Sequence, residues 1–377
     1  MKVVVFSRFP HDINQPRGGV ETATLGLLKG LAKHKEIDLH VVTLEKDVDE
    51  ARVDRLEWVT VHRLPKSGWP LFLDILYGPG RKRVDDYIRG LAPDIVHFQE
   101  TYGIGAGDVG APNIFTVHGF DSLNLPTSKP RFWRLRSAIW RYVESKGLVN
   151  QKYIVSITPY VRDEIEAKTA AKIVDIDNAI DEKYFSLPHD EIKGRIFFAG
   201  WLNARKNPIT LVKAFAKLVE KGVDAELRIA GEASDSDYFN RLQETIEKEG
   251  VKDKVVLLGR LNQQQIQQEL QNTALFVLPS YQENAPMAIA EAMAVGIPVV
   301  SSNVCGMPYM IEEGRTGYLV DPDDIPGLAD KMAKLLLDDE GRREMGKECK
   351  EEAYRRYHPD SVARKTVDLY QQVIASS

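Results

Sequence analysis

Cysteine is scarce in this chain, with two residues among 377. Cys305 and Cys349 provide neither a disulfide framework nor a Cys-x-x-Cys metal pair, which fits a reducing compartment. Long apolar runs are also missing, because no stretch of eighteen apolar residues occurs and the apolar start at residues 3–6 is too short for a signal peptide. We therefore expect a cytoplasmic protein that does not span a membrane.

An excess of basic charge is absent as well. The net charge is -5 and the sequence pI is about 6.0, whereas nucleic-acid binders usually carry a basic domain or stripe. The eight histidines show no zinc-type spacing. We expect no nucleic-acid partner and no zinc centre. A length of 377 residues suits two α/β domains better than a single core.

The chain does contain a repeated alternation of apolar, β-rich runs and amphipathic segments, which is typical of parallel sheets covered by helices. The first series predicts strands at residues 2–7, 37–43, 94–98, 113–117, 153–157 and 172–177, with helices such as 20–34 and 132–148. The second series predicts strands at residues 195–199, 225–230, 255–258, 275–278, 297–301 and 318–320. A polar, proline-containing stretch at 180–190 separates them. We expect two doubly wound Rossmann-like domains, residues 1–185 and 186–358, and a final helix from residue 359 with one apolar face.

Two glutamates, Glu283 and Glu291, bracket the start of a predicted helix that follows the strand at 275–278. Pro286 suits a first helical position, and Gly296 can end the helix. The unpaired N–H groups at about 285–288 would then form a diphosphate site, with the positive end of the helix dipole behind them. One carboxylate remains on each side to accept hydroxyl groups, so we expect a sugar beside Glu283 and a ribose beside Glu291. The predicted binding residues of this segment are Glu283, Asn284, Ala285, Pro286, Met287 and Glu291.

The glutamate pair belongs to an ordered series of motifs that covers most of the chain. Ala292-Met293-Ala294 and Gly296-Ile297-Pro298-Val299-Val300 follow it, and the other motifs run from Gly200 to Pro208, Leu227 to Glu232, Val256 to Arg260 and Gly314 to Val320. The series resembles the retaining GT-B glycosyltransferases of family 4, also called group 1. The resemblance implies the GT-B fold, in which two Rossmann-like domains face each other across a cleft and the final helix, residues 359–377, packs back on the first domain.

Arg205 and Lys206 follow the predicted strand at 195–199 and precede Asn207-Pro208, an N-cap and first-turn pair for the next helix. Ligands of doubly wound sheets bind beyond the carboxyl ends of the strands. Two cations there can stabilise the negative charge that grows on a departing nucleoside diphosphate. We therefore assign Arg205 and Lys206 to the leaving group.

The first domain offers two further candidates. Gly18 and Gly19 precede a predicted helix and allow a ligand to approach the backbone closely; by resemblance, their loop contacts the donor phosphates and the acceptor. His118 and Asp121 follow the predicted strand at 113–117, and His118 resembles the family's active-site histidine. In the second domain the backbone around Arg260 is expected to contact the base.

The resemblance implies transfer of a hexosyl group from a GDP- or UDP-linked sugar to a hydroxyl of a glycan or lipid-linked acceptor, with the anomeric configuration retained. Glu283 then holds sugar hydroxyls and is not a nucleophile. Asp235-Ser236-Asp237 looks like a loop that leads into a helix, so we predict metal independence and no cofactor. One position departs from the family pattern, since Trp201 stands where arginine is common, and this leaves the donor sugar open.

A basic, aromatic segment at residues 129–152 gives a hint about the acceptor. Its seven cations face only Glu144, and four aromatic residues are interleaved with them; these residues are Lys129, Arg131, Phe132, Trp133, Arg134, Arg136, Trp140, Arg141, Tyr142, Lys146 and Lys152. Such a helix can lie on anionic headgroups, and the apolar run at 68–73 could add an insertion loop. This predicts contact with the inner face of a membrane and a role in envelope polysaccharide or glycolipid biosynthesis. The alternative is a packed helix with a solvated basic face.

Two other functions stay open on the sequence. An inverting GT-B transferase or a sugar-nucleotide epimerase of similar architecture would need a positioned base and leaves the glutamate pair unexplained. A non-catalytic nucleotide-sugar-binding protein is suggested only by Trp201.

Overall fold

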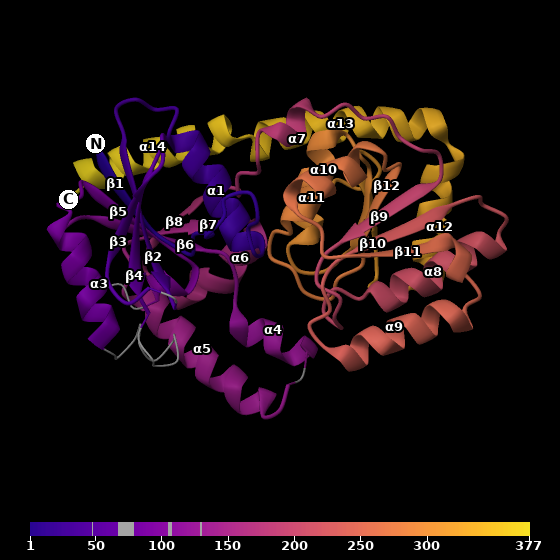
Figure 1. The fold of residues 1–377 in the computed structure, drawn as a ribbon, viewed down its shortest axis with the longest axis horizontal. Helices are drawn as coiled ribbons and strands as arrows, with labels where there is room; N and C mark the ends of the chain where they lie inside the picture. Colours follow the sequence, from indigo (N-terminus) through magenta and orange to yellow (C-terminus); the bar gives the residue numbers. More distant parts are fainter. Residues whose placement is uncertain (47, 67–78, 105–107, 129) are drawn as a thin grey trace. The chain divides into compact units, whose positions relative to one another are not determined.

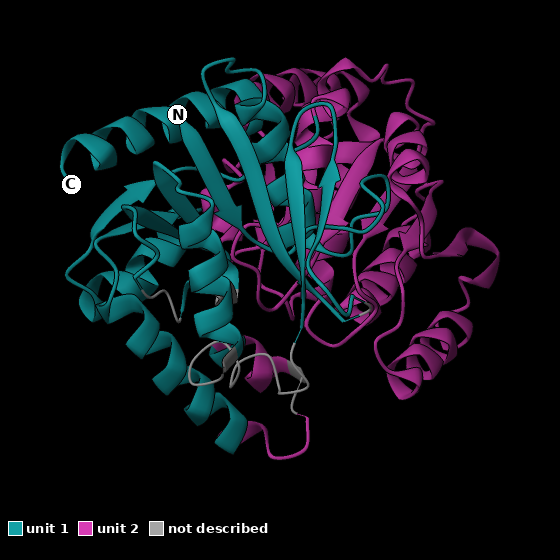
Figure 2. Ribbon diagram, turned by 60° about the vertical axis from the view of Figure 1, so that its left-hand side comes forward, with its two compact units in different colours: residues 1–122, 135–181, 357–377 teal, residues 123–134, 182–356 magenta. Residues whose placement is uncertain are grey.

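The computed structural model describes residues 1–46, 48–66, 79–104, 108–128 and 130–377, and the chain forms two compact units (Figures 1 and 2). Unit 1 comprises residues 1–122, 135–181 and 357–377, and unit 2 comprises residues 123–134 and 182–356. The apolar run at 68–73 and Lys129 lie outside the described residues.

Unit 1 is built on an eight-stranded sheet with the order β3-β4-β2-β1-β5-β6-β7-β8. Its strands are β1 (Lys2–Phe6), β2 (Asp38–Glu45), β3 (Arg52–Arg55), β4 (Thr60–Pro65), β5 (Ile95–Gln99), β6 (Asn113–Val117), β7 (Tyr153–Ser156) and β8 (Lys172–Asp175). The pair β3–β4 is antiparallel, and the other pairs are parallel. The central strands β1 and β5 are almost fully buried, as strands covered on both faces are, and β5 carries two polar residues, His97 and Gln99, among its apolar ones.

The helices of unit 1 cover this sheet (Figure 1). They are α1 (Gly19–Leu31), α3 (Pro79–Gly90), α5 (Trp133–Val149), α6 (Pro159–Ile165) and α14 (Pro359–Ala375), with 3-10 turns at Glu100–Gly103 and Glu166–Lys168. The helix α4 (Asp121–Ser128) begins in unit 1 but lies mostly in unit 2. Residues 123–134, which include most of α4 and the start of α5, belong to unit 2.

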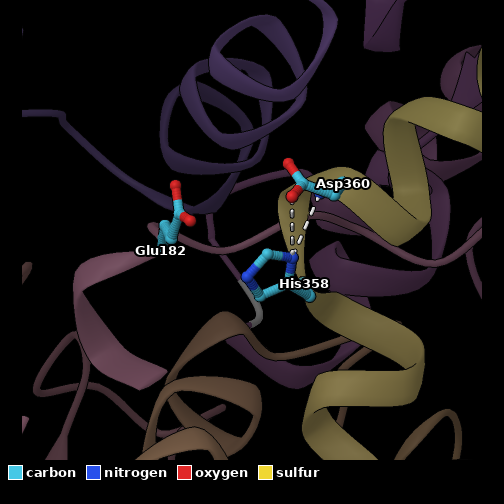
Figure 3. Close-up of side chains that lie close together, drawn as sticks. All are labelled: Glu182, His358 and Asp360. Atoms are coloured by element: carbon cyan, nitrogen blue, oxygen red, sulfur yellow. Dashed lines mark hydrogen bonds and ion pairs between the residues drawn. The ribbon is translucent and has the colours of Figure 1, made fainter. Parts of the chain in front are cut away.

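The last helix, α14, packs against α1. A Cβ atom added at Gly30 of α1 would lie 2.5 Å from the carbonyl oxygen of Pro359, so glycine permits this close approach. The apolar positions of α14 that the sequence singled out, Val362, Val367, Tyr370 and Val373, are all buried. At the start of the helix the His358 ring accepts a hydrogen bond from the Asp360 N–H at 3.3 Å (Figure 3).

Unit 2 contains a six-stranded sheet of order β11-β10-β9-β12-β13-β14, in which every pair is parallel. Its strands are β9 (Arg195–Ala199), β10 (Glu226–Ala230), β11 (Val255–Gly259), β12 (Leu275–Leu278), β13 (Val299–Ser302) and β14 (Gly317–Val320). Its helices are α7 (Lys183–Ser186), α8 (Pro208–Glu220), α9 (Ser236–Lys248), α10 (Gln263–Gln271), α11 (Met287–Val295), α12 (Ile325–Leu337) and α13 (Asp339–Tyr357), with 3-10 turns at Lys252–Lys254 and Met307–Tyr309.

The sequence missed the strands β3 and β4 of unit 1. β3 has the sequence Arg-Val-Asp-Arg and is largely exposed, because it is the antiparallel edge strand of the sheet. A short, charged edge strand carries no apolar signal, so its sequence resembles that of a loop. None of the helices in the described part of the chain combines the length and apolar composition that crossing a bilayer requires.

Candidate active site

The order of the strands brings two loops of unit 2 together. β9 pairs with β12, with Ile196 opposite Leu275 and Phe197 opposite Phe276. Because the two strands are parallel, the loops that follow them leave the sheet at the same edge. The loop after β9 carries Arg205 and Lys206, and the loop after β12 carries Glu283.

Both cations bind the same carboxylate oxygen. Glu283 Oε1 lies 2.5 Å from Arg205 Nη1 and 2.7 Å from Lys206 Nζ. Arg205 Nη1 also donates to the carbonyl oxygen of Gln282 at 2.8 Å. The side chains of Lys206 and Glu283 are each 10% exposed, so these charge-assisted bonds are little screened by water. The structure therefore places three predicted site residues in one cluster.

Lys206 is held in place through its backbone and its methylene groups. Its N–H donates to Asn203 Oδ1 at 3.0 Å, and a Cβ atom added at Gly200 would lie 3.3 Å from Lys206 Cδ and Cε. Burial lowers the pKa of the Lys206 ammonium, while Glu283 acts in the opposite direction.

The start of α8 corrects one detail of the prediction. Asn207 occupies the N-cap position, but its backbone is left-handed, with φ of 58°, and its side chain makes no capping bond. The side-chain amide instead donates to the carbonyl oxygen of Pro322 at 3.2 Å. The left-handed residue turns the chain sharply between Lys206 and the helix.

Pro286 also differs from the prediction. It is the N-cap of α11, with ψ of 116°, and Met287 is the first helical residue. The N–H groups of the first turn have no partner within the helix, as in any α-helix, although Ile289 N bonds to the Pro286 carbonyl. Gly296 ends the helix in the left-handed conformation, as predicted, with φ of 97°. Glu291 lies in the second turn and is half-buried.

A third loop, which follows β13, contacts the backbone of Glu283 and its neighbours. Gly306 N donates to the carbonyl oxygen of Glu283 at 2.8 Å, and a Cβ atom added at Gly306 would lie 1.7 Å from the carbonyl oxygen of Asn284. Cys305 is left-handed, with φ of 56°, and its Sγ lies 2.8 Å from Gln282 Oε1. By resemblance to the family, the region Cys305-Gly306-Met307 lies where members often contact the donor, but its sequence does not indicate which sugar binds.

Arg260 does not join this cluster. It follows β11, the edge strand of the sheet, and its side chain is half-exposed and lies 3.8 Å from Glu232. Trp201, in the loop after β9, is 44% exposed.

In unit 1, His118 follows β6 directly, and its Nε2 lies 2.5 Å from Gln99 Oε1 at the end of the neighbouring strand β5. Burial lowers the pKa of His118 to about 4, so the imidazole is neutral near pH 7. Asp121, the first residue of α4, is exposed. Gln99 was missed from the sequence.

Gly18 is the N-cap of α1 and has φ of 98°, which favours glycine, and Gly19 is the first helical residue. A Cβ atom at Gly18 would meet nothing within 4 Å. The backbone conformation, and not a lack of space, therefore favours glycine at this position.

Comparisons with known proteins bear on both units. The chain matches the family model Glycosyltransferase Family 4 over residues 17–184 and the model Glycosyl transferases group 1 over residues 179–353. It is also 32% identical to the uncharacterized glycosyltransferase MJ1607 of Methanocaldococcus jannaschii over 381 residues, covering 94% of each chain. The chain belongs to the family 4, or group 1, glycosyltransferases. The predicted family is confirmed.

Solved structures confirm the predicted GT-B fold of the glycosyltransferase. The sucrose-phosphate synthase of Thermosynechococcus elongatus matches it with a TM-score of 0.82 at 20% identity, over 100% of both chains. HepE of Anabaena, in complex with UDP and glucose, matches with a TM-score of 0.72 at 15% identity, over 99% of this chain and 100% of that one.

The glycosyltransferase is also similar to part of a named enzyme. It is 32% identical to the N-acetyl-alpha-D-glucosaminyl L-malate synthase of Bacillus anthracis over 164 residues, which are 44% of this chain and 42% of that protein. The alignment thus spans less than half of that relative.

Proposed function

We propose that this glycosyltransferase moves a hexosyl group from a UDP- or GDP-linked sugar to a hydroxyl of a glycan or lipid-linked acceptor, with retention of the anomeric configuration. The observation that carries the proposal is the cluster of the buried Lys206 and Glu283 with the half-buried Arg205 at the carboxyl edge of the unit 2 sheet. The complex of the similarly folded HepE with UDP and glucose supports a nucleotide-sugar donor.

The two cations are assigned to the diphosphate. In the reaction the bond between the anomeric carbon and the diphosphate oxygen breaks, and the acceptor oxygen bonds to that carbon from the same face. The acceptor proton passes to the departing phosphate. Arg205 and Lys206 stabilise the charge that develops on the leaving group. Since two fixed cations supply this stabilisation, the proposal needs no metal ion and no cofactor.

The remaining site residues are assigned to the other parts of the donor. Glu283 exchanges its cation partners for sugar hydroxyls when the diphosphate binds, and Glu291 accepts the ribose hydroxyls. The backbone of Asn284, Ala285, Pro286 and Met287 binds phosphate at the start of α11. By resemblance, the backbone at Arg260 contacts the base, and His118, Asp121, Gly18 and Gly19 contribute from unit 1 to the transferred sugar and the acceptor.

The acceptor is proposed to be reached at the inner face of a membrane through α5. This helix buries Ser137, Val143 and Leu148 on one side. On the opposite side Leu135, Ile139, Tyr142 and Val149 are 43–63% exposed. Arg134, Arg141 and Lys146 of the same helix are exposed, and Lys146 Nζ lies 5.8 Å from the centre of the Tyr142 ring. An apolar strip edged by cations fits an anionic bilayer surface better than it fits a solvated basic face.

The first test is thermal stabilisation by nucleoside diphosphates and their sugars, with EDTA present. A ligand that binds only the folded state raises stability by about 2.7 kcal/mol at a hundred times its dissociation constant. We expect one of UDP, GDP and ADP to give a selective shift that is reduced in Lys206→Ala and Glu291→Ala but kept in Lys217→Ala, an exposed lysine of α8. No shift with any nucleotide would remove the donor-site assignment, and a shift that requires added Mg²⁺ would remove metal independence.

A further inference from the structure

A buried chain of hydrogen bonds leads from His118 into the core of unit 1. His118 Nε2 lies 2.5 Å from Gln99 Oε1, and Gln99 Nε2 lies 3.0 Å from His97 Nε2. The other ring nitrogen of His97, Nδ1, lies 2.7 Å from the hydroxyl of Tyr370. The chain thus connects the end of β6, through β5, to the C-terminal helix α14.

These polar groups are deeply buried. Tyr370 is 0% exposed, Gln99 1% and His97 2%. His97 and Gln99 are two residues apart on β5, so they share one face of the strand. Burying an imidazole and an amide in a central strand is unfavourable unless each finds partners, and apolar residues would fill the same space at lower cost. Their presence in this strand calls for a role other than packing.

The bonds specify where the protons lie. Burial lowers the pKa of His97 to about 3 and that of His118 to about 4, so both rings are neutral near pH 7 and each has one N–H donor and one acceptor. Gln99 Oε1 only accepts, which places the His118 proton on Nε2. The Gln99 amide N–H donates to His97 Nε2, which places the His97 proton on Nδ1, facing the Tyr370 oxygen.

Further contacts fix the inner end of the chain. Thr116 Oγ1, on β6, lies 2.6 Å from His97 Nε2, the nitrogen that Gln99 also contacts. The Tyr370 ring meets the His97 ring edge to face, with centroids 5.7 Å apart. Each group therefore fixes the orientation of the next, and α14 supplies the last anchor.

We propose that Gln99 and Tyr370 are positioning residues that hold His118 in its Nε2–H tautomer, so that Nδ1 is its acceptor nitrogen. That this matters for glycosyl transfer rests on the proposed function, in which His118 contacts the sugar. The hydrogen-bond chain itself stands on the geometry of unit 1. It gives α14 a task in the reaction although none of its residues is assigned to substrate.

The test measures the tautomer of His118 and the catalytic rate separately. Histidine-selective ¹⁵N labelling and NMR report which His118 nitrogen carries the proton in the full-length protein. We expect Nε2–H in the unaltered protein and a mixture of tautomers in Gln99→Leu and Tyr370→Phe. In Tyr370→Phe, which loses one hydroxyl, kcat should fall by about tenfold while the donor KM stays unchanged.

Tyr87→Phe is the matched control. It removes another tyrosine hydroxyl that binds a histidine of unit 1, at 2.9 Å from His62 Nδ1, and His62 lies on β4, which β2 and β1 separate from β5 in the sheet. The His118 tautomer and kcat should both be unaffected. Gln99→Glu is a second variant, because a carboxylate beside His118 favours the imidazolium and should move the acid limb of the kcat profile to higher pH.

Two outcomes overturn the proposal. An unchanged His118 tautomer in both Gln99→Leu and Tyr370→Phe would show that the chain does not set the proton, and an altered tautomer with unchanged kcat would show that the reaction does not use it. If the unaltered protein transferred no sugar from any donor, the proposed function would fail, while the NMR arm would still decide whether Gln99 and Tyr370 fix the tautomer.

Discussion

At the scale of single residues, Glu283 has two tasks that exclude each other. Without ligand its carboxylate compensates Arg205 and Lys206, and in the proposed complex the diphosphate takes over these cations. A buried cation pair without any anion would be unfavourable. In the proposed function the carboxylate therefore compensates the two cations until the donor arrives, and it competes with the donor for the same partners.

This competition predicts an uncommon phenotype for Glu283→Gln. The free protein should lose about 3 kcal/mol of unfolding free energy, because the buried Lys206 and the half-buried Arg205 lose their counter-charge. Nucleoside diphosphate should bind at least as tightly as to the unaltered protein, since no carboxylate competes, while glycosyl transfer is lost. Urea unfolding, calorimetric titration and a transfer assay measure the three quantities.

Glu269→Gln is the control for that variant. Glu269 also binds an arginine of unit 2, with Oε2 at 2.6 Å from Arg228 Nε, but this pair lies between α10 and β10, away from Glu283. It should leave both nucleotide affinity and transfer unchanged. Weaker binding of the diphosphate to Glu283→Gln would mean that the carboxylate assists the phosphate contacts instead of competing with them.

At the scale of elements, apolar runs predicted twelve of the thirteen described strands that pair in parallel to within about two residues, because strands covered on both faces are rich in apolar residues. The pairing of Glu283 with both cations could not be predicted in this way. It depends on β9 lying beside β12, two strands that are far apart in the sequence. Strand order is set by packing of the whole sheet, and no local pattern encodes it.

The buried hydrogen-bond chain behind His118 was not predicted, although the sequence contains one sign of it. His97 and Gln99 interrupt the apolar strand Ile-Val-His-Phe-Gln at alternate positions, which marks one polar face on a buried strand. The partner Tyr370 was predicted only as an apolar position of the last helix. Its hydroxyl is 273 residues away from His97 along the chain, and only the fold reveals the contact.

The prediction at the scale of elements concerns the helix α5. If its exposed strip lies on a bilayer, Leu135→Gln together with Ile139→Gln should weaken binding to vesicles containing anionic lipid by at least about tenfold, because two apolar side chains no longer leave water. Folding should be unaffected, since Leu135 is 63% and Ile139 43% exposed. Vesicle co-sedimentation measures the binding.

Leu337→Gln is the matched control, because Leu337 is 71% exposed at the end of α12 in unit 2. It should bind vesicles as the unaltered protein does. Equal binding of all variants, or binding that does not depend on anionic lipid, would contradict the proposed membrane contact and leave α5 as a packed helix with a solvated face.

At the scale of the whole molecule, the buried titratable groups of unit 1 oppose one another. Burial lowers the pKa values of His62 to about 4 and of His97 to about 3. Burial also raises the pKa values of the carboxyl groups of Asp85, Glu100 and Glu144. As pH falls, the histidines destabilise the folded state and the carboxyl groups stabilise it. The pH dependence of the unfolding free energy of the unaltered protein is therefore the sum of two opposing contributions, and neither can be measured from it alone.

Comparing the unaltered protein with His97→Gln isolates one histidine. Below pH 6.5 His97 is protonated in the unfolded chain, whereas in the folded chain it stays neutral down to about pH 3. Over that window His97 lowers the unfolding free energy by about 1.4 kcal/mol for each pH unit that the pH falls. His97→Gln should be less stable at pH 7, because Tyr370 and Thr116 lose a partner. Between pH 7 and pH 5 the difference in unfolding free energy between the two proteins should shrink by about 2 kcal/mol, because the unaltered protein loses that stability through His97 and the variant does not. The carboxyl groups are common to both proteins and cancel. Urea unfolding at the two pH values measures the difference, and a gap that stays constant would show that His97 is protonated in the folded state well above pH 5.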